Sequence, residues 1–190
     1  MPCNLHNICY NEGQTALFFF MLIWNDNIKL PEELKTGVLN RIQETYRDKR
    51  KFYTSHSLNG RRFADLLVPF YTKVIENMMR DLGLYKNTTY GFNLWVQMYN
   101  SETTTHPPHS HYGIGGTEII SFTHVINASK NKCFYFLNDH GDKIHPDHQE
   151  SGDIFAWPSY LIHGVDKVQE PNLNRLIVAG NVALETYSNP

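Results

Sequence analysis

The sequence predicts an α+β fold in which two helices support a β-sandwich or jelly roll. Amphipathic helical patterns occupy residues 31–84, whereas from residue 90 onward short β-branched and aromatic runs alternate with clusters of Gly, Pro, Asn and Asp. Helices followed by several short strands are typical of this architecture. A chain of 190 residues can bury one ordinary core and is short for two, so we expect a single domain over residues 1–190.

Two helices are expected in the first half of the chain. The first begins at Pro31, whose fixed φ suits the first helical position, and acidic residues fill its first turn. The second covers residues 62–82, where we expect Pro69 to kink or split it and Gly83 to end it. We interpret residues 31–84 as helical support that covers one face of a sheet. Apolar residues recur at helical spacing at Leu34, Val38, Leu39, Ile42 and Tyr46, and again at Phe63, Leu66, Leu67, Phe70, Val74, Met78 and Leu82.

Six strands are expected in residues 90–190, which we interpret as the jelly-roll core. A turn at Pro158 and Ser159 separates the fourth of these strands from the fifth. The expected strands cover residues 92–99, 118–127, 132–137, 153–157, 161–165 and 175–184.

An apolar run, residues 15–24, precedes the first helix. It has about half of the roughly 20 residues that a membrane-spanning helix needs, so a buried strand is the better interpretation. Met21 and the residues after it could themselves begin a protein, which leads to the hypothesis that residues 1–20 form a loosely attached extension. No Lys or Arg precedes Lys29, so the basic start of a secretory leader is missing.

Charge and cysteine content narrow the classes of partner and compartment. The formal net charge is −2 with both signs spread along the chain, so no global field attracts nucleic acid or a membrane surface. Three cysteines, Cys3, Cys9 and Cys133, cannot all pair within one chain and lack metal-site spacing. We therefore expect a reducing, cytoplasmic compartment; the composition predicts no oligomeric state.

A histidine pair, His109-x-His111, is the strongest functional signal in the sequence. Side chains two positions apart on a strand project to the same face, so both imidazoles could bind one divalent metal. His163, which follows the expected turn at Pro158, could supply a third ligand from a distant strand. Arg175, at the start of the last expected strand, could hold a carboxylate through two parallel hydrogen bonds. The set predicts a metal site beside an anionic co-substrate.

The motifs around these residues resemble those of the 2-oxoglutarate- and Fe(II)-dependent oxygenases, especially small bacterial and phage members and prolyl-hydroxylase-like members. The resemblance covers the second half of the chain and implies a double-stranded β-helix, a jelly roll flanked by helices. It rests on Trp95-x-x-x-Tyr99-Asn100, His109-Ser-His111, residues 121–127, the run from Gly152 to Val165, and Asn174-Arg175.

Carried over residue by residue, the resemblance implies that His109, His111 and His163 bind Fe(II) and that Arg175 binds the distal carboxylate of 2-oxoglutarate. Tyr99 stands where prolyl-hydroxylase-like members place a tyrosine that helps to hold the co-substrate. The implied reaction uses dioxygen, converts 2-oxoglutarate to succinate and carbon dioxide, and hydroxylates a substrate. We expect a small molecule or a peptide, in a bacterial or phage-infected cytoplasm, and neither nucleic acid nor a membrane as partner.

The expected strand over residues 118–127 would contribute hydroxyl groups to the same pocket. Alternation puts Ser121, Thr123 and Val125 on one face, which we take to face the pocket, and His124 on the far face. Ser121 or Thr123 could then offer a hydroxyl to the co-substrate. His106, which precedes two prolines, is expected in a loop at the pocket rim.

His111 departs from the family pattern, in which two histidines and one carboxylate bind the metal. An imidazole at this position makes the site one unit more positive and suits zinc, copper and nickel as well as iron. Glu118 is a less favoured anionic ligand, because its distance along the chain from His111 imposes no geometry.

Two other functions stay open. One is a cupin-type three-histidine metalloenzyme that does not use 2-oxoglutarate, since HxH is more typical of cupins. Against it stand Arg175 and the lack of a glutamate soon after the histidine pair. The other is a non-catalytic jelly-roll binding or structural module, which the substitution at His111 favours.

Overall fold

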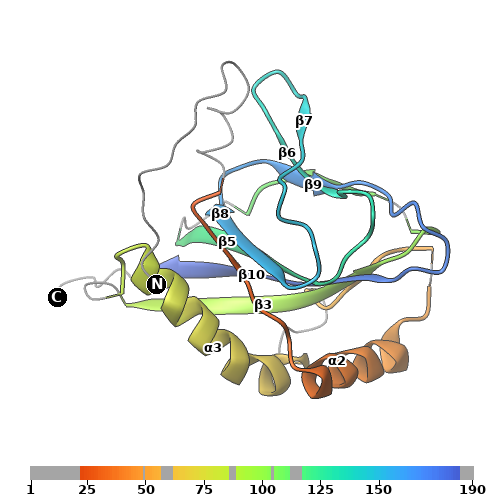
Figure 1. The fold of residues 1–190 in the computed structure, drawn as a ribbon, viewed down its shortest axis with the longest axis horizontal. Helices are drawn as coiled ribbons and strands as arrows, with labels where there is room; N and C mark the ends of the chain where they lie inside the picture. Colours follow the sequence, from red (N-terminus) through yellow and green to blue (C-terminus); the bar gives the residue numbers. More distant parts are fainter. Residues whose placement is uncertain are drawn as a thin grey trace.

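The computed structural model describes residues 22–48, 50–56, 62–85, 89–103, 105–111 and 117–184. Over these residues the chain forms two antiparallel sheets and two helices, in three layers (Figure 1). The helices lie beneath the large sheet, and the small sheet lies above it (Figure 1). Most of the apolar run over residues 15–24, and the extension hypothesised for residues 1–20, fall outside the described residues.

The large sheet has six strands in the order β1-β8-β5-β10-β3-β2, and the small sheet has four in the order β4-β9-β6-β7. The strands of the large sheet are β1 (Trp24–Asn27), β2 (Tyr53–Thr54), β3 (Tyr90–Tyr99), β5 (Glu118–Asn127), β8 (Asp153–Pro158) and β10 (Arg175–Leu184). Those of the small sheet are β4 (His106–His109), β6 (Phe134–Leu137), β7 (Lys143–Ile144) and β9 (His163–Val165).

Helices α2 (Glu32–Thr45) and α3 (Ala64–Asp81) cover the lower face of the large sheet, as the sequence predicts. The expectation that Pro69 splits the second helix is wrong, because α3 runs through it without interruption. Pro69 lies in the second turn of α3 and removes one backbone hydrogen bond close to the N-terminus of the helix. The buried residues that follow it in α3 keep the helix packed against the sheet. Gly83 follows α3 with a φ of 73°, a conformation that favours glycine.

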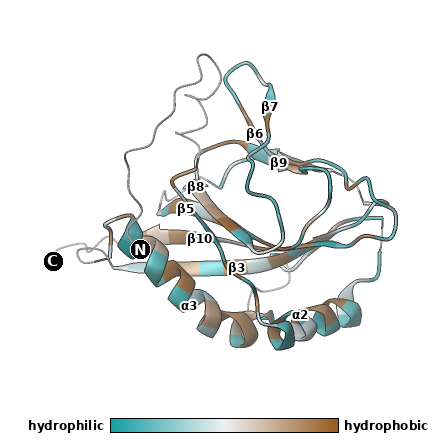
Figure 2. Cartoon of the chain, in the orientation of Figure 1, coloured by the Kyte–Doolittle hydropathy of each residue, from teal (hydrophilic) through white to brown (hydrophobic). Residues whose placement is uncertain are grey.

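Strand alternation divides the apolar side chains between two cores. On β3, Leu94, Val96 and Met98 pack against the helices, whereas Trp95 and Tyr99 belong to the cluster between the two sheets. Figure 2 shows hydrophobic colouring in the large sheet and along α3, while the loop that joins β6 to β7 is hydrophilic. The space between the sheets is therefore the interior in which a site can be built.

The register of the large sheet places polar residues in rows that face this interior. One row joins Asn93, Asn181, Ser121 and Trp157 across four strands. Arg175 and Tyr99 pair at the other end of β10 and β3. A site on this face therefore draws its side chains from several strands.

The predicted double-stranded β-helix flanked by helices agrees with this architecture, and all six expected strands differ from the observed ones by two residues or fewer at each end. Over residues 161–165 only His163–Val165 is a strand. The expected loop at His106 is wrong, since this residue begins β4. Among the described residues β4 is an edge strand beside β9, and its pairing is irregular between His106 and His109, which accommodates the two prolines.

The described residues contain no helix with the length and apolar character that crossing a lipid bilayer requires.

His124 lies on the helix side of β5, as alternation predicts, and is fully buried. Its Nε2 lies 2.7 Å from the Ile28 carbonyl and its Nδ1 lies 2.7 Å from the Tyr71 hydroxyl. Because a carbonyl can only accept, Nε2 carries the proton and the Tyr71 hydroxyl donates to Nδ1. Burial lowers the pKa of His124 to about 4, so the folded protein holds this ring neutral.

The buried neutral His124 is expected to make the protein acid-sensitive. Its pKa of about 4 in the folded state lies below the 6.5 of an exposed histidine, so between these values the unfolded chain binds a proton that the folded chain does not. Stability should fall as the pH is lowered through this window, by about 3 kcal/mol from this group. Chemical denaturation at pH 7, 6 and 5 measures the effect. A His124→Asn variant should be less stable at pH 7 but lack this part of the pH dependence; an equal dependence in both proteins would contradict the assignment.

Candidate metal centre

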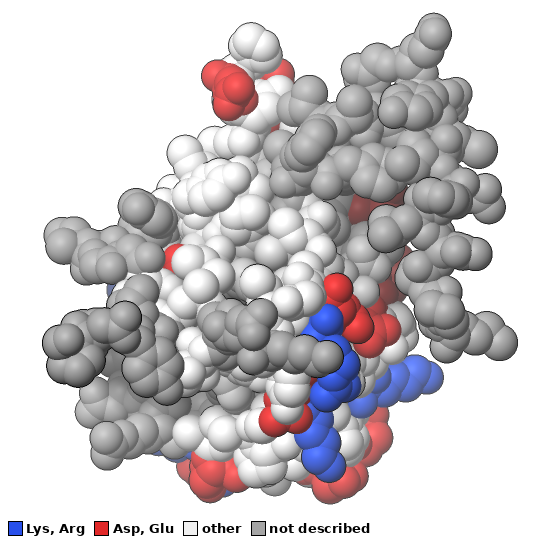
Figure 3. Space-filling model, turned by 90° about the vertical axis from the view of Figure 1, so that its left-hand side faces the viewer, with Lys and Arg blue, Asp and Glu red and all other residues white. Residues whose placement is uncertain are grey.

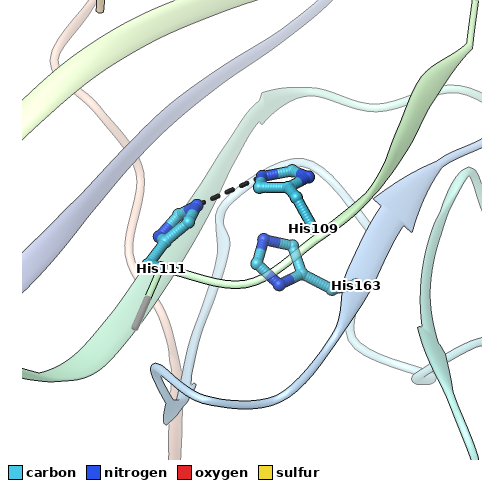
Figure 4. Close-up of side chains that lie close together, drawn as sticks. All are labelled: His109, His111 and His163. Atoms are coloured by element: carbon cyan, nitrogen blue, oxygen red, sulfur yellow. Dashed lines mark hydrogen bonds between the residues drawn. The ribbon is translucent and has the colours of Figure 1, made fainter. Parts of the chain in front are cut away.

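Three imidazoles converge between the two sheets (Figure 4). One ring nitrogen from each of His109, His111 and His163 lies within 4.8 Å of the others. His109 and His163 are cross-strand partners on β4 and β9. His111 does not share a strand with His109, as the alternation argument expects, because β4 ends at His109. Instead, its backbone N–H donates to the Ser159 carbonyl at 3.0 Å, which holds the residue beside the end of β8.

Backbone carbonyls fix the tautomers of two of the histidines. Nδ1 of His109 lies 2.9 Å from the carbonyl of Pro107, and Nδ1 of His163 lies 3.0 Å from the carbonyl of Leu161. Because these oxygens can only accept, each Nδ1 carries the proton and each Nε2 presents a lone pair. The Nε2 atoms of both rings are therefore available as metal ligands.

The third histidine has the same tautomer for a different reason. Nδ1 of His111 lies 2.7 Å from the side-chain oxygen of Asn181 and 3.1 Å from the hydroxyl of Ser121. The amide oxygen can only accept, so this Nδ1 also carries the proton. Nε2 of His111 then faces Nε2 of His109 at 3.2 Å (Figure 4).

Two lone pairs at this distance repel unless a proton or a metal ion lies between them. A proton on His111 is disfavoured, since burial lowers its pKa to about 4; burial likewise lowers the pKa of His163 to about 3. Three neutral imidazoles that share one tautomer and point at one another fit a divalent metal ion. Glu118 is not part of this group and lines the outer chamber instead.

The imidazoles separate an outer chamber from an inner cavity. The outer chamber has a volume of about 460 Å³ and is lined by aromatic rings, amide side chains and Glu118. The inner cavity, about 20 Å³, lies among the three histidines, Thr123 and Trp157. Its volume is that of about one water molecule.

Two buried groups on the barrel interior have hydrogen-bond donors without partners. Arg175 is 1% exposed, and neither of its terminal nitrogens has an acceptor among the described residues. The indole N–H of Trp157, also 1% exposed, is unpaired as well. Burial lowers the pKa of Arg175, and its ionisable neighbours are Cys133 and Tyr99 rather than a carboxylate. A buried cation that lacks a counter-charge is suited to an anionic ligand.

Tyr99 supports the guanidinium but its hydroxyl is already engaged. The Arg175 guanidinium carbon lies 5.7 Å from the centre of the Tyr99 ring, within range of a cation–π contact. The Tyr99 hydroxyl donates to the Gln97 side-chain oxygen at 2.9 Å and lies 3.2 Å from Nδ1 of His106. Burial raises the pKa of Tyr99, so it stays protonated.

The two hydroxyls expected to meet the co-substrate have different places. Thr123 lines the inner cavity with the histidines. Ser121 lies behind His111, where its hydroxyl bonds Asn181 at 2.9 Å and Ser159 at 3.0 Å. Its position indicates a role in orienting His111.

The residue-by-residue prediction missed Asn181, Gln97 and Trp157, whereas His106, expected at the pocket rim, lines the outer chamber. Alternation could have identified two of them, because Asn181 is six positions from Arg175 and Gln97 is two from Tyr99, so each shares the inward face. His106 packs between Phe52 and His109, with ring centroids 4.6 and 4.3 Å away.

Solved structures provide the comparison with known proteins. No protein-family model matches the chain, and no curated protein matches its sequence. The non-heme alpha ketoglutarate dependent epimerase SnoN from nogalamycin biosynthesis is 9% identical, with a TM-score of 0.58 over 83% of this chain and 76% of that one. A Pseudomonas putida prolyl-4-hydroxylase is 12% identical, with a TM-score of 0.55 over 86% and 92% of the two chains.

A third similar structure is a prolyl hydroxylase from Trichoplax adhaerens, solved with a peptide fragment of a hypoxia inducible factor oxygen degradation domain. It is 12% identical, with a TM-score of 0.58 over 84% of this chain and 82% of that one. At these identities the likeness concerns the fold. The chain has the double-stranded β-helix fold of the 2-oxoglutarate- and Fe(II)-dependent oxygenases, which its motifs resemble.

Proposed function

We propose that the chain is a 2-oxoglutarate- and Fe(II)-dependent oxygenase that hydroxylates a small-molecule or peptide substrate. The observation that carries the proposal is the unpaired, buried guanidinium of Arg175, which lies in the same barrel interior as three convergent Nε2 donors. A metal site alone would need no such cation. A dicarboxylate that binds the metal at one end would neutralise Arg175 at the other.

The chain's residues would divide the work between them. His109, His111 and His163 would hold the ion, and Arg175 would grip the distal carboxylate while the Tyr99 ring supports its guanidinium. When bound, Fe(II) and 2-oxoglutarate would supply oxygen activation coupled to decarboxylation to succinate. The apolar cluster around the inner cavity, which includes Phe134, Phe136 and Phe155, would exclude water from that chemistry.

The distance along β10 suits a short dicarboxylate. Arg175 and Ala179, the residue beside Thr123, are four positions apart, or roughly 14 Å along a strand. A diacid that binds both the metal and Arg175 would have to span this interval together with the arginine side chain. Because the inner cavity is only about 20 Å³, we expect its side chains to move when the co-substrate binds.

The outer chamber would receive the primary substrate. Glu118 is the only Asp, Glu, Lys or Arg among the described residues that line it; four histidines, Trp95, Phe52 and several amides form most of the remaining wall. Figure 3 shows one face of the molecule, on which the basic side chains gather toward the lower right beside acidic ones, while the described middle of the face is mostly uncharged. A polar substrate that is neutral or cationic fits this lining better than a phosphate-rich one.

The three-imidazole ligand set favours one competing function, a cupin-type metalloenzyme that does not use 2-oxoglutarate. The two functions differ in their response to the co-substrate. Reconstitution with Fe(II) under anaerobic conditions, followed by 2-oxoglutarate, should give a visible metal-to-ligand charge-transfer band, and admission of oxygen should yield succinate. Iron that binds but does not respond to 2-oxoglutarate would favour the cupin-type enzyme. Failure to bind iron stoichiometrically would favour the non-catalytic module.

A further inference from the structure

The side chain of Asn181 contacts the one metal-site histidine that departs from the usual ligand pattern. Its oxygen lies 2.7 Å from Nδ1 of His111, the shortest of the contacts that fix the three tautomers. Asn181 is 8% exposed, and its backbone N–H donates to the Asn93 side chain at 3.1 Å, so its position on β10 is fixed.

A hydrogen-bond network around this contact determines which group donates and which accepts. The Ser121 hydroxyl lies 2.9 Å from the Asn181 oxygen, 3.0 Å from the Ser159 hydroxyl and 3.1 Å from Nδ1 of His111. An amide oxygen has two lone pairs and accepts from both Nδ1–H and Ser121. All of the short contacts are then satisfied with the proton of His111 on Nδ1.

We propose that Asn181 is a positioning residue that makes His111 an Nε2 metal ligand. Without this acceptor, His111 could carry its proton on Nε2 and donate it to the lone pair of His109, since their Nε2 atoms are 3.2 Å apart. That tautomer would close the metal site with a hydrogen bond. The inference rests on the proposed metal centre, but it requires neither 2-oxoglutarate nor catalysis.

The same network accounts for imidazole in place of the usual carboxylate. Asn181 could bond a carboxylate at position 111 only after its amide turned to present the NH2 group, whereas in the observed orientation its oxygen accepts the proton of an imidazole. Asn181 and Ser121, from neighbouring strands, thus form a cradle that recognises an N–H donor. In this proposal the residues around His111 support an imidazole as the metal ligand, so the position is not a degraded carboxylate site.

Two substitutions at position 181 separate this role from a purely structural one. Asn181→Asp keeps an acceptor and cannot donate, while Asn181→Leu removes the acceptor at similar volume. Titration of the metal-free protein with Co(II), followed by its visible absorption, measures affinity without enzyme turnover. We expect Asn181→Leu to bind Co(II) about 10- to 100-fold more weakly. Asn181→Asp should bind at least as tightly as the unchanged protein.

The tautomer itself provides a second readout. In nitrogen-15 NMR spectra of the metal-free protein, His111 should be protonated on Nδ1 with Asn or Asp at position 181, and should lose this preference with Leu. Ser159→Ala, which removes the outer hydroxyl of the network, is the matched control and should change Co(II) affinity by less than Asn181→Leu. Unchanged Co(II) affinity and tautomer in Asn181→Leu would overturn the proposal. An Asp variant as weak as the Leu variant would overturn it too, and neither result depends on 2-oxoglutarate activity.

Discussion

Replacing His163 by alanine is expected to abolish stoichiometric metal binding. The ring is mostly buried, its Nδ1 is tied to the Leu161 carbonyl, and His109 is its cross-strand partner. Only two imidazoles would remain, and two neutral donors form no closed site for a divalent ion. Metal content after gel filtration, and Co(II) absorption, measure the loss.

The loss of the metal site should also be visible in stability. A ligand that binds only the folded state stabilises it by about 2.7 kcal/mol at one hundred times its dissociation constant. Metal ions should therefore raise the melting temperature of the unchanged protein but not that of His163→Ala. His140→Ala is the control, because this histidine is exposed, lies outside the three-imidazole group, and within the described part of the chain forms a hydrogen bond only through its backbone. Metal binding that survives in His163→Ala would show that the three rings are not the site.

The interior rows of the sheet show how far strand periodicity reaches. Alternation along residues 118–127 correctly separates Ser121 and Thr123 from His124, because a strand buried on both faces has only two sides. The sequence also predicts that His163 joins His109 from a distant strand, and the two residues are cross-strand partners. Strand periodicity cannot predict the hydrogen bonds that set the histidine tautomers, however, because the partners in these bonds can lie far apart in sequence. Asn181 and His111 are 70 positions apart.

The errors of prediction have local causes. Two successive prolines make β4 look like a loop, because proline removes backbone donors; the irregular pairing of β4 with β9 between His106 and His109 accommodates both of them. The spacing places His111 on the same strand as His109, but the strand ends at His109, two residues before His111. Tyr99 shows a different limit, because its hydroxyl bonds Gln97 and the sequence gives no sign that this partner competes with a ligand.

Replacing Arg175 by methionine is expected to weaken 2-oxoglutarate binding and to stabilise the ligand-free protein. The guanidinium is 1% exposed and its terminal nitrogens are unpaired, so the empty protein carries the cost of a buried charge. Methionine fills similar space without that charge, and we expect a gain of about 2 kcal/mol, or a melting temperature higher by roughly 4–8 °C. Loss of a buried charge-paired contact should lower 2-oxoglutarate affinity by about 2–5 kcal/mol, which is about 30- to several-thousand-fold.

The opposite signs of the two effects distinguish a ligand-binding arginine from a structural one. Calorimetric titration of the Zn(II)-loaded protein with 2-oxoglutarate measures the affinity, and thermal unfolding measures stability; metal affinity should stay nearly unchanged. Arg175→Lys keeps the charge without the two-pronged donor, so it should bind weakly and gain no stability. Arg41→Met is the control, because Arg41 pairs with Asp65 on the helical surface at 2.6 Å. If Arg175→Met instead lowered stability and metal affinity together, the guanidinium would be part of the scaffold. If the protein is more stable without Arg175, the buried cation does not serve stability, and binding of an anion explains its presence.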